Sequence, residues 1–548
     1  MELLTRRDWI KSTAVPLLAG GLPHTVITSD IVVYGATSGG VLAAVQAARL
    51  GTNVTLLARH DSIGGASSNG LGFADVGWWT SIGGLAYEFF HRLWLYYRNP
   101  AAWRWQSRES YKGVQGQGPP AMDDRLKAMW CFEPHAAEYV FRAMLKEAGV
   151  RVVHGQLDRS AGGVNCDGSM IHSIRTIQGD IFRSGIFIDA TYEGDLMAAV
   201  GVRYFTGREA NNIYGETIDG IEKRLAIGNQ LPPGIDPWKI RGHRNSGLLP
   251  GVFQHIDGAD GSGDSKIQAY GYRMCLTDVA SNRVAVEKPE GYDPEAYELL
   301  FRSISAGVRR FFTLSTLPNR KTDSNNSGGM STDYIGMSYG YPDGTDAERK
   351  IISQNHRRWQ MGLVWTIQHH PRVPVEIRRF YRPWGLARDE FTRTGNWPEE
   401  IYVREARRMI GEFVQTQNQV LDDHAIRDGA LLGSYTMDSH NVQRYVDHLG
   451  QVRNEGDVQW RVPRPYRVSW RIILPRRAEA QNLLVAAAVS ASHMGFGSLR
   501  LEPVFMMLGQ VAGTAAALSH RNRAGVHALP YDVLRRQLLT DHQILEWH

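Results

Sequence analysis

The clearest chemical signal in the sequence is a glycine-rich turn near the N-terminus, Gly35-Ala36-Thr37-Ser38-Gly39-Gly40. Glycines spaced in this way let the backbone approach a pyrophosphate, and a helix that begins at the turn directs unpaired N–H groups toward the phosphates. Gly35 would form the tight turn, and Gly40 would let the helix pack closely on the preceding strand. The turn therefore indicates a dinucleotide site, provided that a strand precedes it and a helix follows it.

The flanking segments supply that context. Residues 31–34 predict a buried strand, residues 41–50 a helix that stops at Gly51, and residues 54–57 a second strand. Two positions depart from the usual fingerprint: Thr37 replaces the middle glycine, and Ala58 stands where an acidic residue would meet the ribose. By itself, the turn also fits a strand–helix–strand unit that binds nothing.

A second strand–turn–helix pattern lies near the C-terminus. Residues 483–489 form a nearly continuous apolar run, typical of a parallel strand that is covered on both faces. A turn containing Gly495 and Gly497 follows, and then a helix rich in alanine and methionine. This helix would direct its positive end toward a ligand, and the alternative is a crossover unit with nothing bound.

Composition limits the class of protein. The chain has 548 residues, of which 43% are hydrophobic and 21% charged, as in a globular protein with a large core. A net charge of +5 on scattered residues gives no signature of nucleic-acid binding. The three cysteines lie far apart, which excludes a cysteine-built metal site or disulfide framework and leaves at most one bridge. No apolar run reaches the roughly 18 residues of a membrane span, so no stable membrane anchor is expected.

The N-terminus predicts an export signal. Arg6 and Arg7 precede a short, weakly apolar stretch over residues 12–22, a pattern typical of twin-arginine signals. The alternative is an ordinary basic N-terminus. We assign residues 1–28 to the signal, which implies a periplasmic or secreted protein that takes up its cofactor before export.

Further blocks extend the pattern along the chain. They occupy residues 64–72, 82–90, 132–138, 189–196, 318–323, 402–409, 437–443, 490–503 and 508–513. Together with the glycine turn, and in the same order, these blocks resemble the family of FAD-dependent oxidoreductases that often carries the label "xanthan lyase-like". The resemblance covers about residues 30–520. The lyase label itself does not follow from the residues.

The resemblance implies an α/β fold. FAD would bind a glutathione-reductase-like Rossmann domain that is discontinuous in sequence, with an inserted α+β region that faces the substrate. The FAD domain would comprise residues 29–205 and 471–525, the insertion residues 206–470, and a C-terminal tail residues 526–548.

The resemblance also implies the residues that bind FAD. In this family a threonine at the middle of the phosphate turn is usual, whereas the acidic ribose residue has no counterpart, which leaves Arg59 and Asp61 as candidates to replace it. The predicted cofactor-binding residues are Gly35, Thr37, Ser38, Gly40, Arg59, Gly64, Gly65, Ala66, Ser67, Leu157, Ala190, Asp195, Gly497 and Leu508.

Two histidines lie in blocks expected to face the flavin. Neutral imidazole, with an ordinary pKa of about 6.5, is the default proton acceptor in alcohol oxidation. His440 lies between Asp438 and Asn441, either of which could orient its ring, and His493 precedes the second glycine turn. We predict both as catalytic bases, with a purely structural role as the alternative for each. His369 and His370 lack a carboxylate at metal-ligand spacing, so no metal site is predicted.

Arg404, Arg500 and Asn325 are the predicted substrate-binding residues. Guanidinium stays charged and cannot act as a base, so the two arginines would anchor the substrate or the flavin. Asn325 lies in a polar loop over residues 323–329 that either reaches the active site or is an ordinary surface loop. The sequence thus predicts an exported enzyme that transfers a hydride from a CH–OH or CH–NH group of a small molecule to FAD. Its 15 tryptophans and 22 tyrosines favour a carbohydrate or glycoside substrate. A flavin-dependent lyase or isomerase that oxidises such substrates transiently is the alternative, and a non-enzymatic flavin-binding protein is a third. Neither the electron acceptor nor the oligomeric state follows from the sequence.

Overall fold

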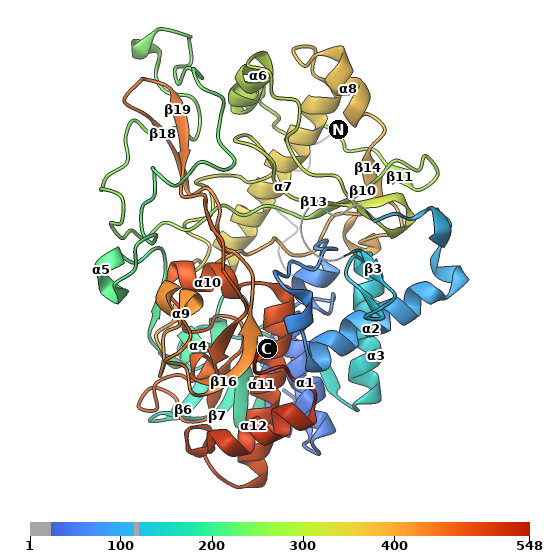
Figure 1. Ribbon diagram of the computed structural model, residues 1–548, viewed down its shortest axis with the longest axis vertical. Coiled ribbons are helices and arrows are strands. Elements are labelled where there is room, and N and C mark those ends of the chain that lie inside the picture. Colours follow the sequence, from blue (N-terminus) through green and yellow to red (C-terminus); the bar gives the residue numbers. More distant parts are fainter. Residues whose placement is uncertain (1–23, 114–119, 548) are drawn as a thin grey trace, which may run out of the picture.

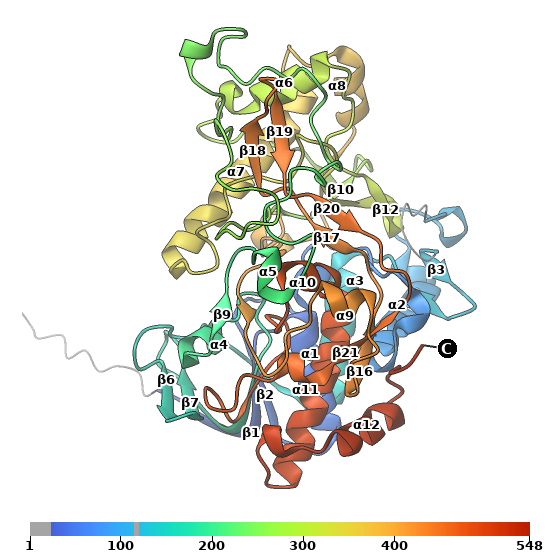
Figure 2. The same ribbon diagram turned by 60° about the vertical axis from the view of Figure 1, so that its left-hand side comes forward.

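The computed structural model describes residues 24–113 and 120–547. Figure 1 shows two regions along the longest axis of the molecule. The lower region combines N-terminal and C-terminal segments, and the upper region contains most of the middle of the chain. Figure 2 shows the same arrangement after a turn of 60°.

A mainly parallel sheet forms the centre of the lower region. Its parallel strands, in spatial order, are β5 (Arg151–His154), β2 (Val54–Ala58), β1 (Val26–Tyr34), β8 (Ile181–Asp189) and β22 (Leu483–Val485). β7 (Met170–Arg175) pairs antiparallel with the start of β8, and β6 (Val164–Asp167) pairs with β7. Because the five strands are parallel, their carboxyl ends lie along one edge of the sheet, where open α/β sheets bind ligands.

Two helices pack tightly against each other on this sheet. A Cβ atom added to Gly509 would lie 2.0 Å from the carbonyl oxygen of Gly39, and one added to Gly513 would lie 2.3 Å from that of Ala43. Glycine therefore sets the spacing between α1 (Ser38–Arg49) and α11 (Glu502–Arg521). These contacts advance in the same direction along both helices, so α1 and α11 run parallel.

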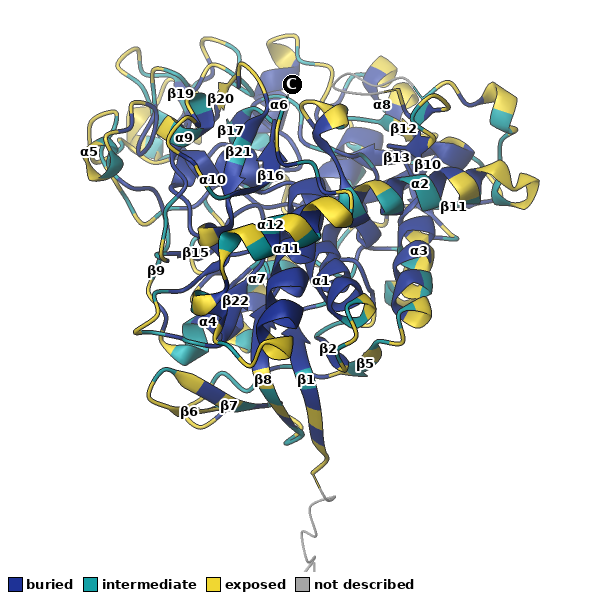
Figure 3. Ribbon diagram, turned by 60° about the horizontal axis from the view of Figure 1, so that its bottom comes forward, coloured by how far each residue is buried: buried dark blue, intermediate teal, exposed yellow. Residues whose placement is uncertain are grey.

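Four other helices lie around this pair, α2 (Gly84–Arg98), α3 (Pro134–Glu147), α10 (His493–Leu499) and α12 (Tyr531–Thr540). Both α1 and α11 are almost wholly buried, whereas α12 has an exposed outer face (Figure 3). α4 (Asp195–Val200) packs on the opposite face of the sheet, in a separate apolar cluster.

The upper region has its own hydrophobic core around an antiparallel sheet. Its strands, in spatial order, are β11 (Arg283–Val284), β14 (Gly385–Ala387), β10 (Met274–Thr277), β13 (Lys321–Ser324) and β12 (Ser315–Leu317). Three helices contribute to the region, α6 (Glu298–Ser305), α7 (Asp346–His369) and α8 (Val375–Tyr381). A capping box between Thr345 and Glu348 fixes the start of α7.

The two cores divide the chain differently from the ranges expected from the sequence. α9 (Gln417–Leu421), β16 (Gly429–Gly433) and β21 (Tyr466–Ser469) lie within residues 206–470, yet their apolar side chains join the core of the lower region. The remaining helices and strands are short. They are α5 (Asn211–Tyr214), β3 (Met122–Asp123), β4 (Ala128–Met129), β9 (Tyr204–Phe205), β15 (Arg408–Met409), β17 (Met437–Ser439), β18 (Gln443–Val446), β19 (Val452–Glu455) and β20 (Val458–Trp460).

Most local predictions from the sequence are confirmed, with three differences. Gly495 and Gly497, which were expected in a turn, lie inside the helix α10. The apolar run 483–489 is a strand only over its first three residues. β1 begins at Val26 and pairs with β8 from there, so the folded chain starts inside the range 1–28 expected for the export signal. Arg6 and Arg7 lie outside the described residues. Among the described helices none is long and apolar enough by itself to cross a membrane, although α10 and α11 satisfy the length and composition criteria as a pair bent by 92°.

Candidate functional site

The turn between β1 and α1 has the geometry of a phosphate cradle. Gly35 adopts a left-handed φ of 100°, and a Cβ atom on Gly40 would lie 1.9 Å from the carbonyl oxygen of Gly35. Thr37 caps the helix, since its Oγ1 accepts a hydrogen bond from the N–H of Gly40 at 3.2 Å. The same hydroxyl donates to the carbonyl of Ala190 at 2.7 Å. Thr37 thus ties the turn to the end of β8, which explains a threonine at this position.

A second glycine loop lies against this turn. Gly64 has a φ of 113°, and its N–H donates to the carbonyl oxygen of Ala36 at 2.8 Å. The Ala66 N–H donates to the Tyr192 hydroxyl at 2.9 Å, and Ser67 Oγ donates to Glu502 Oε2 at 3.0 Å. Burial raises the pKa of Glu502, which lies in the first turn of α11. The structure therefore brings the predicted residues Gly64 to Ser67 together with the β1–α1 turn.

A cavity of about 460 Å³ lies at the carboxyl ends of β2, β5 and β8. Its lining includes Arg59, Gln156 and Glu193, which directly follow these strands or their terminal turns, and Arg349 from α7. Ala58 leaves no carboxylate at the end of β2, whereas Glu193 places one in the cavity, 3.1 Å from Arg59 Nη1. Although burial opposes ionisation, Arg59 and Arg349 lower the pKa of Glu193.

Of the predicted cofactor residues, only Arg59 is among those that line this cavity. Four of the others, outside the two glycine loops, are buried by contacts within the protein. Asp195 is enclosed by arginines, with Arg349 at 2.8 Å, and these ion pairs lower its pKa despite burial. Leu157 and Leu508 are completely buried in the hydrophobic cores. Gly497 packs on another strand, since a Cβ atom there would lie 2.9 Å from the carbonyl oxygen of Asp438. These four residues support the fold around the cofactor region and do not line its cavity.

A second cavity, polar and about 330 Å³ in volume, takes its walls from both regions. We call it the polar cavity. Carboxylates and amides dominate its surface, together with one arginine and one histidine. Its lining residues are Phe73, Asp75, Asn229, Arg273, Thr313, Ser315, Asp323, Asn325, Asn326, Ser327, Tyr435, Asp438, His440 and Gln459.

His440 is a wall residue of the polar cavity with an oriented ring. Its Nδ1 lies 2.8 Å from Asp333 Oδ2, and its Nε2 lies 3.4 Å from Asp438 Oδ2. Burial and Arg404 oppose protonation, but Asp333 and Asp438 raise the pKa of His440 above its ordinary value of 6.5. In turn, although burial opposes ionisation, His440 and then Arg500 lower the pKa of Asp438 to about 2. The sequence prediction of Asp438 as an orienting partner agrees with this contact.

The predicted substrate residues divide between the cavity and its support. Asn325 lines the polar cavity. Arg404 pairs with Asp333 at 2.8 Å, and Arg500 pairs with Asp438 at 2.6 Å. Both arginines are buried behind the wall, so they hold the carboxylates that flank His440 and lie outside the lining.

His493 has a different environment. It is 2% exposed, its Nδ1 lies 2.8 Å from Glu405 Oε2, and its Nε2 lies 3.1 Å from Ser439 Oγ. Although burial opposes ionisation, His493 and Arg408 lower the pKa of Glu405 to about 2. Both ring nitrogens are occupied, and His493 does not line the polar cavity.

Sequence reasoning missed most of the wall residues, among them the charged Asp75 and Arg273. Asp75 follows the Gly64–Gly72 loop, and burial raises its pKa to about 6, against the opposing effect of Arg273. Arg273 pairs with Asp323 at 2.7 Å, while its Nε has no hydrogen-bond partner among the described residues. An acidic residue directly after the glycine loop was the available signal for Asp75. Arg273 gave only the weaker signal of an arginine beside an apolar segment.

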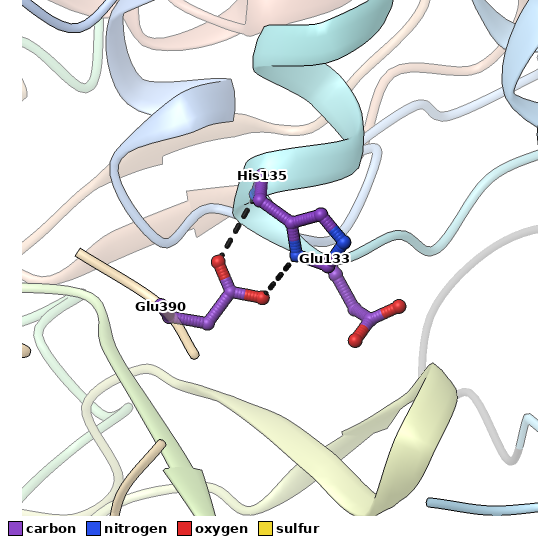
Figure 4. A group of neighbouring side chains, drawn as sticks. All are labelled: Glu133, His135 and Glu390. Carbon is purple, nitrogen blue, oxygen red and sulfur yellow. Dashed lines mark hydrogen bonds and ion pairs between the residues drawn. The ribbon is translucent and has the colours of Figure 1, made fainter. Parts of the chain in front are cut away.

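A cluster with metal-like spacing contains Glu133, His135 and Glu390 (Figure 4). Lys321 Nζ lies 2.9 Å from Glu133 Oε1 and 2.6 Å from Glu390 Oε1. Although burial opposes protonation, Glu390 raises the pKa of His135 to about 9. The ammonium group pairs with both carboxylates and joins β13 of the upper region to the start of α3 in the lower one. We therefore interpret the cluster as an ionic link between the regions.

The structure is a mixed α/β protein with a mainly parallel sheet, a glycine turn after β1, and two polar cavities. The chain belongs to the family described as "FAD dependent oxidoreductase", whose sequence model matches residues 30–538. This membership supports FAD as the cofactor and oxidoreduction as the class of reaction. No curated protein matches the sequence.

Solved structures give partial matches. L-proline dehydrogenase from P. horikoshii is 18% identical over 34% of this chain and 59% of its own, with a TM-score of 0.22. A 3-ketosteroid dehydrogenase from Rhodococcus jostii RHA1 is 17% identical over 34% and 52%, with a TM-score of 0.21. OxyS anhydrotetracycline hydroxylase from Streptomyces rimosus is 14% identical over 34% and 36%, with a TM-score of 0.23. The chain thus spans between 36% and 59% of these structures, and likeness at this level bears on neither substrate nor mechanism.

Proposed function

We propose that this oxidoreductase removes a hydride from a CH–OH group of a carbohydrate or glycoside held in the polar cavity. The observation that carries the proposal is His440, an oriented imidazole in the wall of a cavity otherwise rich in hydroxyl-binding side chains. A polyhydroxylated substrate matches such a wall, because carboxylates and amide oxygens accept hydrogen bonds while Arg273 donates them.

In this proposal FAD binds the lower region, as a glutathione-reductase-like domain would hold it. Gly35, Thr37 and Gly40 form a cradle that any larger residue at either glycine would fill. Glu193 is the carboxylate available to the ribose in place of one at Ala58. When bound, FAD supplies the hydride acceptor.

The chain's own contribution to the chemistry is proton handling. Asp333 holds Nδ1 of His440, so Nε2 would take the proton of the reacting hydroxyl once the substrate displaces its contact with Asp438 Oδ2 at 3.4 Å. Arg404 keeps Asp333 charged, and Arg500 does the same for Asp438, since each guanidinium pairs with its carboxylate. The two arginines are therefore positioning residues for the base.

A second candidate substrate class is supported by the excess of carboxylates in the wall. Asp75, Asp323 and Asp438 face a single arginine, Arg273, and an ammonium group would balance this charge. In that case the bond oxidised would be CH–NH, with the amine proton taken by the same imidazole.

The test is net turnover with an added electron acceptor, using a panel of sugars and amines. Oxidation of a CH–OH group predicts one molecule of carbonyl product for each two electrons delivered to the acceptor. Product formed without any reduced acceptor would instead establish lyase or isomerase chemistry. Turnover of amines alone would show that the enzyme oxidises a CH–NH bond, the second candidate reaction.

A further inference from the structure

A third cavity, about 610 Å³ in volume, adjoins the polar cavity. The two share Tyr435, Asp438 and Gln459 as lining residues. We call it the aromatic cavity, because three tryptophans are among its lining residues. Its lining residues are Val76, Gly77, Trp78, Trp79, Thr80, Ser434, Tyr435, Thr436, Asp438, Gln459, Arg461, Val462 and Trp547.

The tryptophans come from distant parts of the chain and meet here. Trp547 follows α12, and its ring centroid lies 5.4 Å from that of Trp78 at an interplanar angle of 68°. Ion pairing between Glu546 and Arg535 of α12, at 2.7 Å, holds the segment that carries Trp547. The segment is also bound to the lower region, since the Gly84 N–H donates to the carbonyl oxygen of His542 at 2.9 Å.

The loop that carries Trp78 is fixed equally closely. A Cβ atom on Gly77 would lie 1.7 Å from the carbonyl oxygen of Ser434, so only glycine permits this approach. The N–H of Trp78 donates to Ser434 Oγ at 3.1 Å. Both tryptophans therefore occupy set positions, although the side chain of Trp78 remains 40% exposed.

We infer that the aromatic cavity binds a second sugar ring of the substrate, beyond the ring that reacts in the polar cavity. Flat indole faces suit the C–H faces of a pyranose, and Gln459, Arg461 and Asp438 offer hydrogen-bonding groups to its hydroxyls. A purely apolar ligand would leave these polar groups unpaired, at an energetic penalty. The shared wall of Tyr435, Asp438 and Gln459 marks the position of the bond that joins the two rings. The inference rests on the proposed carbohydrate substrate.

The experiment measures anaerobic flavin reduction of the holoenzyme by glucose and galactose, and by cellobiose, maltose and lactose. We expect at least one disaccharide to have a lower KM than its component sugars. Trp547→Ala should raise that KM by about tenfold, the loss expected for about 1.4 kcal/mol of aromatic contact. The same substitution should leave KM for the monosaccharide and the flavin content unchanged.

Trp460→Ala is the matched control. Trp460 is 42% exposed, close to the value for Trp78, and lies between Gln459 and Arg461 without lining the cavity. It should behave as wild type. Equal effects of Trp547→Ala on monosaccharides and disaccharides, or no effect on either, would overturn the inference.

Binding provides a readout that does not depend on oxidation. The Kd for the same disaccharides, measured by quenching of tryptophan fluorescence, should rise in Trp547→Ala. If no sugar reduces the flavin but this quenching depends on Trp547, the proposed function fails and the sugar subsite stands. If phenyl β-glucoside responds to Trp547→Ala and no disaccharide does, the second ring is an aromatic group and the sugar inference is wrong.

Discussion

The cofactor cradle and the polar cavity are built in opposite ways. The cradle is largely backbone, formed by the short run from Gly35 to Gly40 with Gly64 beside it, and its geometry depends on the absence of side chains. The polar cavity is made of side chains from segments hundreds of residues apart, such as Asp75 and His440. The cradle is therefore sensitive to added volume, whereas the cavity is sensitive to lost functional groups.

Substitution of Gly40 should produce the largest effect. Gly40→Val would place atoms within 1.9 Å of the carbonyl oxygen of Gly35 and close the phosphate turn, so FAD binding should be lost. The measurement is flavin content after purification in excess FAD. Gly185→Ala is the matched control, because a Cβ atom there meets nothing closer than 3.9 Å. If Gly40→Val folds and retains its full flavin content, the turn from Gly35 to Gly40 does not bind the phosphates of FAD.

Loss of the imidazole in the polar cavity comes next. His440→Asn should retain FAD and slow anaerobic flavin reduction by about 100-fold or more, the scale of general-base loss. His493→Asn is the informative comparison, because both nitrogens of that ring are already bonded within the protein. It should reduce flavin at nearly the wild-type rate while melting at a lower temperature. The reverse ranking of the two variants would make His493 the base.

The pH dependence separates His440 from Asp75. A base acts only when it is unprotonated, so the reduction rate should rise with pH through an apparent pKa above 6.5. Although burial opposes protonation, Asp333 and Asp438 raise the pKa of His440 above that ordinary value. If Asp75 were the base, the rise would centre near its pKa of about 6. Asp75→Asn should leave the position of the rise unchanged, and its disappearance in this variant would identify Asp75 as the base.

The smallest effect is expected at the ribose end of the cradle. Glu193→Gln should weaken FAD binding by about tenfold, a change of about 1.4 kcal/mol, because it removes a charged hydrogen-bond acceptor and leaves Arg59 without its partner. Fluorescence titration of the flavin-free protein measures this Kd. Glu399→Gln is the control, since Glu399 lines the same cavity with a more exposed side chain. An unchanged Kd in Glu193→Gln would leave the missing acidic residue at Ala58 without a replacement.

The sequence predicted the cofactor cradle better than the polar cavity. Local patterns define the strands and helix around Gly35, because hydrophobic periodicity and glycine act over a few residues. The glycines that hold α1 against α11, such as Gly509, act only after both helices have met, and their partners are not visible in sequence. Of the site, His440 and Asn325 were predicted to take part, whereas Asp75 and Arg273 reach the cavity through long-range packing. The buried pairs of Arg404 and Arg500 likewise could not be predicted, since charge alone suggests exposed anchors.

The central proposal is that a sugar bound in the polar cavity is oxidised by FAD. The direct measurement is the visible absorbance of the FAD-loaded protein after anaerobic mixing with sugars, monitored in the wild type and in His440→Asn. We predict saturable bleaching of the flavin by at least one sugar in the wild type, slowed by about 100-fold or more in the variant. Bleaching that is equally fast in both proteins would contradict the account, as would a fully loaded wild type that no sugar bleaches.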